Sequence, residues 1–155
     1  MDQSFNASCQ CNHVQFEIKG PPIVRGYCHC TICQEFNQAP FADITLYRYK
    51  DVAMPSADHV NYKAYAKPEI VQRGKCAKCN KPAVEYAHMG PLGKVVIVPS
   101  ENIKDNALLP EPSMHLFYNR RKADANDTLP KYEGYLRSQM AFMKKVIAGM
   151  LKRSK

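Results

Sequence analysis

The arrangement of the seven cysteines constrains this chain more than any other feature of its sequence. They form three groups: Cys9 and Cys11 (C-x-C), Cys28, Cys30 and Cys33 (C-x-C-x-x-C), and Cys76 and Cys79 (C-x-x-C). An odd number of cysteines would leave one unpaired in a disulfide framework. Zinc prefers four ligands in a tetrahedron, and closely spaced cysteines present their sulfurs to one ion. The spacing therefore indicates metal binding.

Two of the three groups supply two sulfurs each. Cys9 and Cys11 together with Cys76 and Cys79 would complete a four-cysteine zinc site that ties the first part of the chain to its middle. The binding energy of such a site is folding energy. A four-cysteine site built from another pair of groups, or a single zinc with a separate redox group, also agrees with the spacing.

The remaining group, Cys28, Cys30 and Cys33, supplies three sulfurs. Three protein ligands and one open position are typical of a catalytic zinc. His29 would point away from the metal if Cys28 and Cys30 both face it, so we interpret it as a packing residue or a neighbour of the ligands. With this partition we expect two zinc ions per chain, the second in an open site.

Length and charge limit the class of protein. A chain of 155 residues fits one domain, which we expect to span residues 1–155. It has no apolar run of 18 residues and begins without the basic and apolar regions of a signal peptide, so we expect no membrane association and a cytoplasmic location. The formal charge of +8 falls to about +5 with seven thiolates and two zinc ions. That excess suits an anionic small molecule at least as well as nucleic acid.

Short alternating or apolar segments separated by proline and glycine predict a mainly β fold. The predicted strands are residues 14–18, 23–27, 41–50, 60–65, 69–73, 95–98 and 114–118. A helix is predicted over residues 133–152, because apolar residues recur there with helical periodicity. This stripe consists of Leu136, Met140, Met143, Ile147 and Met150. We expect it to pack on the β core or on a partner subunit, which leaves a homo-oligomer open.

The cysteine pattern resembles that of the glutathione-dependent formaldehyde-activating enzyme family, also called the GFA/CENP-V family. Order, spacing and number of the cysteines all agree. So do the strand that begins at Val14, the stretch Pro110-x-Pro112-x-x-His115, and Asp127-x-Leu129-Pro130. The resemblance extends over roughly residues 8–135.

The resemblance implies several short, coiled β-sheets around a structural zinc. It assigns that zinc to Cys9, Cys11, Cys76 and Cys79, and a second zinc to Cys28, Cys30 and Cys33. The implied activity is the addition of glutathione to formaldehyde, which gives S-hydroxymethylglutathione and is formally a carbon–sulfur lyase reaction in reverse. The implied partners are a small-molecule thiol and an aldehyde.

Three residues depart from the common family pattern. Asn12 and Asn80 stand where glycine is common, and asparagine also adopts a left-handed backbone. Gln34 stands where arginine is common, and the tryptophan often found near the downstream histidine is missing. These differences lie near the presumed pocket, so they concern the substrate more than the fold.

The reaction also needs proton transfer and a site for the two carboxylates of glutathione. His115 is our candidate for proton transfer, because it lies in the family-like downstream stretch. Guanidinium groups pair well with carboxylates. The candidate cations are Arg25, Arg48, Lys50, Arg73, Arg120 and Arg121.

The competing hypothesis is a non-catalytic, zinc-stabilised binding module whose obvious partner would be nucleic acid. A basic stripe with interleaved aromatic residues would favour it. The chain has only the short cluster 120–122, which is typical of a solvated turn. The sequence therefore favours the enzyme.

Overall fold

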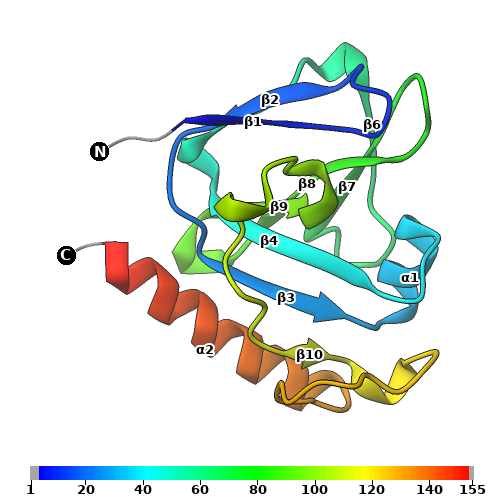
Figure 1. Ribbon diagram of the computed structural model, residues 1–155, viewed down its shortest axis with the longest axis vertical. Helices are drawn as coiled ribbons and strands as arrows, with labels where there is room; N and C mark the ends of the chain where they lie inside the picture. The colour runs from blue at the N-terminus through cyan, green and yellow to red at the C-terminus, as the bar shows by residue number, and fades with distance from the viewer. Residues whose placement is uncertain (1–3, 154–155) are drawn as a thin grey trace.

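The computed structural model describes residues 4–153, which contain ten β-strands and two α-helices (Figure 1). The strands are β1 (Phe5–Ser8), β2 (Gln15–Ile18), β3 (Val24–Cys28), β4 (Ala42–Arg48), β5 (Val52–Ala53), β6 (Val60–Lys63), β7 (Val71–Cys76), β8 (Pro82–His88), β9 (Lys94–Pro99) and β10 (His115–Leu116). The helices are α1 (Thr31–Asn37) and α2 (Tyr135–Arg153). The mainly β fold with a C-terminal helix is confirmed.

The strands form two sheets. The smaller has the order β1-β2-β5, and the larger has the order β10-β3-β4-β9-β8-β7-β6. Neighbouring strands are antiparallel except for β10, which pairs with β3 in parallel. This parallel pairing sets His115 beside Tyr27 and Leu116 beside Cys28. It therefore brings the downstream histidine to the end of the strand that carries the first cysteine of the three-cysteine group.

Two apolar clusters stabilise the fold. One joins the small sheet to the large sheet and includes Ile18, Tyr47 and Val96, all without exposed surface. The other lies between the large sheet and α2 and includes Leu46 and Val146. Burial of such side chains contributes roughly 1.5–3 kcal/mol each.

The apolar stripe predicted for the last helix mostly does not face the core. Leu136, Met140 and Ile147 are exposed, and of the five predicted residues only Met150 is fully buried. The buried side instead includes Ser138 and Val146, because α2 lies along β3 and β10 with that face inward (Figure 1). Of the two alternatives, packing on the β core therefore does not hold for the whole stripe, and packing on a partner subunit stays a prediction.

Two further features matter for the site. Strand β8 and helix α1 were not predicted, because β8 contains a proline and a glutamate and α1 has only seven residues.

Neither helix within residues 4–153 combines the length and the apolarity that crossing a bilayer requires.

Candidate metal centres and the adjoining cavity

The four-cysteine group closes on one point. Cys9 and Cys11 lie in the turn between β1 and β2, Cys76 ends β7, and Cys79 lies in the turn that follows. Their four Sγ atoms are all within 4.8 Å of one another. The Sγ of Cys11 is 3.6 Å from that of Cys9 and 3.7 Å from that of Cys76. A tetrahedron with zinc–sulfur bonds of 2.3 Å has edges of about 3.8 Å, so these sulfurs fit a zinc ion.

The backbone around this group also suits thiolates. The amide N–H of Val14 donates to the Sγ of Cys9 at 3.3 Å, and those of Lys78 and Cys79 donate to the Sγ of Cys76 at 3.3 and 3.4 Å. The two turns therefore direct three backbone donors at the sulfurs of this group. Backbone donors of this kind orient metal ligands.

Asparagine replaces glycine at the two turns without changing their backbone. Asn12 follows Cys11 with φ of 65°, and Asn80 follows Cys79 with φ of 59°. Both values lie in the left-handed region, where asparagine is tolerated better than most residues. The expectation from the sequence is confirmed.

The three-cysteine group is built from a strand-to-helix turn. Cys28 is the last residue of β3, Cys30 is the N-cap of α1, and Cys33 lies in the first turn of that helix. The Sγ of Cys30 accepts a hydrogen bond from the backbone N–H of Cys33 at 3.3 Å. Local geometry alone thus turns the three sulfurs toward one another, within 4.8 Å.

Within residues 4–153, this second group has three cysteines and no fourth donor. In the described part of the chain, no histidine, cysteine or carboxylate joins Cys28, Cys30 and Cys33. Cys28 and Cys33 are buried, whereas Cys30 is half-buried. Hydrogen bonds from Cys28 and Cys33 lower the pKa of the Cys30 thiol well below its ordinary value. Three soft donors without a fourth protein donor fit a zinc ion that can accept one more ligand.

An ion pair lies beside the second group. Nη1 of Arg73 on β7 is 3.9 Å from the Sγ of Cys33 and also bonds Oε1 of Glu85, its cross-strand partner on β8. The side chain of Glu85 is only 1% exposed. Burial raises the pKa of Glu85, and the charge of Arg73 opposes that rise.

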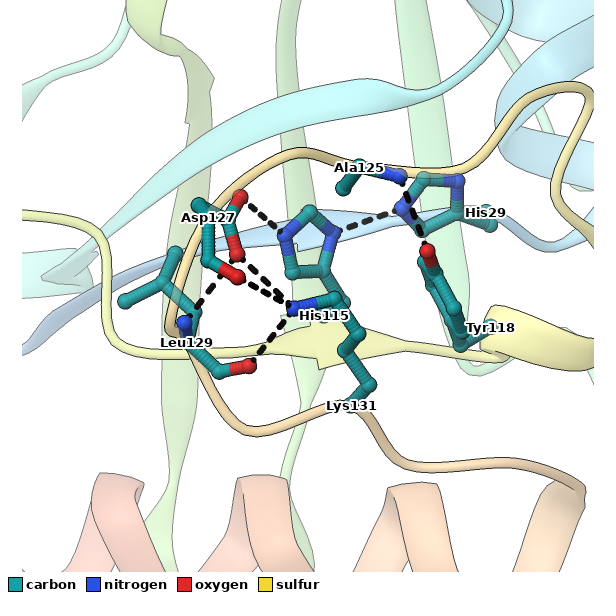
Figure 2. A network of polar contacts seen from close by, with 7 residues as sticks. All are labelled: His29, His115, Tyr118, Ala125, Asp127, Leu129 and Lys131. Atoms are coloured by element: carbon teal, nitrogen blue, oxygen red, sulfur yellow. Dashed lines mark hydrogen bonds and ion pairs between the residues drawn. The ribbon is translucent and has the colours of Figure 1, made fainter.

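A chain of hydrogen bonds runs from a carboxylate through two histidines (Figure 2). Oδ2 of Asp127 is 2.8 Å from Nε2 of His115, and Nδ1 of His115 is 2.8 Å from Nε2 of His29. Lys131 bonds the other carboxylate oxygen, Oδ1, at 3.0 Å. The hydrogen bond from His115, followed by that from Lys131, lowers the pKa of Asp127 to about 2.

When the imidazoles of His115 and His29 are both neutral, these contacts determine which nitrogen of each ring carries the hydrogen. The ionised carboxylate of Asp127 only accepts, so Nε2 of His115 carries a hydrogen and Nδ1 of His115 is an acceptor. Nε2 of His29 must then donate to it. Nδ1 of His29 is left as a buried acceptor without a hydrogen-bond partner among the described residues. The sequence pointed to His115 but not to this role for His29.

The histidines lie at the wall of a cavity of about 380 Å³. Tyr27, His29, Phe41, His115 and Asp127 are among its lining residues. The rings of Tyr27 and Phe41 meet edge to face with centroids 5.2 Å apart. The cavity therefore combines aromatic surface with the His–His–Asp chain, and two of its lining residues flank Cys28 in the sequence.

Most of the six candidate cations are already paired. Arg25 bonds Asp43, Arg73 bonds Glu85, and Arg121 bonds Asp124. Arg48 donates to the carbonyl of Met150 at 2.6 Å. Lys50 and Arg120 are exposed. The cations thus do not gather at the cavity as a set.

Gln34 connects the second cysteine group to a distant loop. Its Nε2 donates to the backbone carbonyls of His29 at 2.7 Å and Arg120 at 2.8 Å. A neutral amide thus occupies the place where the family pattern commonly has arginine. It contributes hydrogen bonds there without adding positive charge.

Fold and site together define a mainly β protein with two cysteine groups, each arranged so that it could bind zinc. Residues 4–120 match the family model of the glutathione-dependent formaldehyde-activating enzyme, and the chain belongs to that family. No curated protein matches it. Its fold is similar to that of a Rhodobacter sphaeroides protein of known crystal structure, with a TM-score of 0.54 and 15% identity over 70% of this chain and 97% of that one.

Proposed function

We propose that this protein is a zinc-dependent enzyme of the carbon–sulfur lyase type that joins glutathione, or a related thiol, to formaldehyde or a related aldehyde. The observation that carries the proposal is that Cys28, Cys30 and Cys33 bring three sulfurs together without a fourth protein donor among the described residues, whereas the separate four-cysteine group is complete. Membership of the family supports the same reaction class.

In this proposal the two cysteine groups have different roles. Cys9, Cys11, Cys76 and Cys79 would hold a structural zinc, and Cys28, Cys30 and Cys33 would hold the zinc used in the reaction. A zinc ion at the second group supplies an open coordination position that favours the deprotonated form of an incoming thiol. A network of backbone and side-chain contacts around both groups orients the ligands.

The reaction moves one proton from the thiol to the carbonyl oxygen of the aldehyde. The sulfur–hydrogen bond of the thiol breaks, the sulfur forms a bond to the aldehyde carbon, and the carbonyl oxygen takes up a proton. His115 would hold that proton in transit, with its ring oriented by the hydrogen bond to the Asp127 carboxylate. His29 would transfer it between the cavity and Nδ1 of His115.

In this proposal the aldehyde would occupy the aromatic cavity, whose lining includes His29 and His115 but none of the three cysteines. Tyr27 and Phe41 provide apolar surface beside His29, so a small aldehyde would meet few competing waters there. Proximity of thiol and aldehyde in such a site is itself a large source of rate.

The decisive experiment follows exchange between ¹³C-formaldehyde and its glutathione adduct by NMR, because this reaction also proceeds without an enzyme. The zinc-loaded protein is expected to accelerate the exchange above the uncatalysed rate. Cys30→Ser is expected to abolish the acceleration, and His115→Gln to reduce it about 10²–10⁴-fold. Full activity in folded Cys30→Ser protein would disprove the role of the second group.

A further inference from the structure

We propose that Arg73, held in place by Glu85, is the counter-charge that positions the three-cysteine group for its metal ion. This inference rests on the second zinc site of the proposed function. It concerns a residue that the sequence pointed to only as a binder of substrate carboxylates.

The electrostatics of the group call for such a cation. One zinc ion and three thiolates carry a net charge of −1, and Cys28 and Cys33 are buried. A buried charge is costly unless an opposite charge or hydrogen-bond donors compensate it. Arg73 supplies both, since its Nη1 lies 3.9 Å from the Sγ of Cys33 and its side chain is only 12% exposed.

Three contacts restrain the guanidinium. Glu85 pairs with it across β7 and β8, in register. The guanidinium carbon lies 5.8 Å from the centre of the Phe36 ring, three residues after Cys33 on the same helix. The side chain thus contacts the carboxylate, the aromatic ring and the sulfur at once. Such restraint is typical of residues that orient metal ligands.

The same contacts argue against substrate binding by Arg73. Its Nη1 already contacts both Glu85 and Cys33, and its side chain is only 12% exposed. A carboxylate of glutathione would have to reach this enclosed guanidinium and bring a further negative charge close to Glu85 and the sulfurs, which is unfavourable. The position of Arg73 also links the two cysteine groups, because β7 carries Cys76 three residues further on.

The test is the zinc affinity of the labile site in the double variant Arg73→Gln/Glu85→Gln. Removing Arg73 alone would leave Glu85 buried without a partner and could unfold the protein, whereas the double variant removes both charges. Titration with Zn²⁺ against a chromophoric chelator is expected to show affinity about 10–100-fold weaker at the labile site. The tightly held zinc is expected to remain. Cobalt(II) charge-transfer bands report the same loss independently of activity.

Two further variants control for charge and for general disruption. Arg25→Gln/Asp43→Asn removes another ion pair between neighbouring strands of the same sheet, with no sulfur contact, and is expected to bind zinc like the wild type. Arg73→Lys keeps the charge and is expected to lose less affinity than the Gln/Gln variant.

The outcomes separate this inference from the proposed function. If the wild type takes up only one zinc, both the second site and the role of Arg73 are overturned. If it takes up two, and the Gln/Gln variant binds the labile one as tightly as the wild type, the role of Arg73 alone is overturned. If Arg73→Lys loses as much zinc affinity as Arg73→Gln/Glu85→Gln, the role of Arg73 as a counter-charge is also overturned.

Discussion

Nδ1 of His115 lies 2.8 Å from Nε2 of His29, although 86 residues separate the two histidines in the sequence. The parallel pairing of β10 with β3 creates this contact by setting His115 beside Tyr27. Because Asp127 holds the far side of the His115 ring, the two imidazoles form a directional chain rather than an incidental contact.

The tautomers of the two histidines can be measured directly. At pH 7, long-range ¹H–¹⁵N correlation spectra are expected to show hydrogen on Nε2 of both His115 and His29. Asp127→Asn is expected to weaken the preference of His115 for hydrogen on Nε2. An amide can donate as well as accept a hydrogen bond, whereas the carboxylate only accepts. Hydrogen on Nδ1 of His29 in the wild type would contradict the assigned chain.

His29 is expected to stay uncharged under physiological conditions. Burial, followed by repulsion from His115, lowers its pKa from 6.5 to about 4. The unfolded chain then binds the extra proton between about pH 6.5 and pH 4, so this group lowers the free energy of unfolding as pH falls through that window. Chemical denaturation from pH 7.5 to 5.5 is expected to show a shallower decrease in His29→Gln than in the wild type. Parallel curves would refute this.

The two cysteine groups are expected to differ in their effect on stability. Cys11 is exposed, so Cys11→Ser removes almost no packing, yet it would open the four-sulfur site, whose proposed zinc would contribute to folding. Its melting temperature is expected to fall by more than about 10 °C, which corresponds to a loss of several kcal/mol. Cys30→Ser serves as the matched variant.

For Cys30→Ser, calorimetry of the zinc-loaded protein is expected to show that the melting temperature falls by only a few degrees. This corresponds to a loss of about 1 kcal/mol in the free energy of unfolding. If Cys30→Ser unfolds the protein and Cys11→Ser does not, the structural and open groups have been assigned in the wrong order.

The left-handed turn after the last cysteine gives a prediction about backbone strain. Asn80 has φ of 59°, and Asn80→Ala is expected to destabilise the protein by roughly 1–2 kcal/mol, because alanine tolerates this conformation poorly. Asn80→Gly should be as stable as the wild type or more so. Thermal unfolding measures both, and equal stability of the alanine and glycine variants would count against strain at this position.

Close contact at Gly149 is expected to control how α2 docks. A Cβ atom there would lie 2.4 Å from the backbone oxygen of Ile23, which cannot move aside easily. Gly149→Ala should therefore cost about 1–3 kcal/mol from overpacking, despite a gain of about 1 kcal/mol in helix propensity. Faster hydrogen exchange along α2 would report the weakened docking, and unchanged exchange would contradict it. Exposed Ala148→Gly is the control for propensity alone.

Local sequence patterns were sufficient for the features that depend on a few neighbouring residues. The spacing of Cys28, Cys30 and Cys33 already predicts that their sulfurs converge, because cysteines two or three residues apart can present their sulfurs to one ion. The same holds for the turns at Asn12 and Asn80. Most strands could be predicted as well, since alternation of apolar and polar residues is itself local.

Features that join distant segments could not be predicted in this way. Glu85 was missed because the sequence of β8 did not indicate a strand, and Arg73 was therefore considered only as a binder of substrate carboxylates. The face of α2 that packs on the sheet also differs from its most regular apolar stripe. The close approach of Gly149 to the backbone of Ile23 influences how the helix docks, and the stripe does not reveal this contact.

The sequence by itself thus determined the ligand chemistry, the mainly β class and the family resemblance, since each follows from residue type and short-range spacing. Only the tertiary structure decided which side chains surround those ligands: His29 against His115, and Arg73 between Glu85 and Cys33. The physical reason is that strand pairing and helix docking depend on the packing of the whole chain, which no short segment specifies.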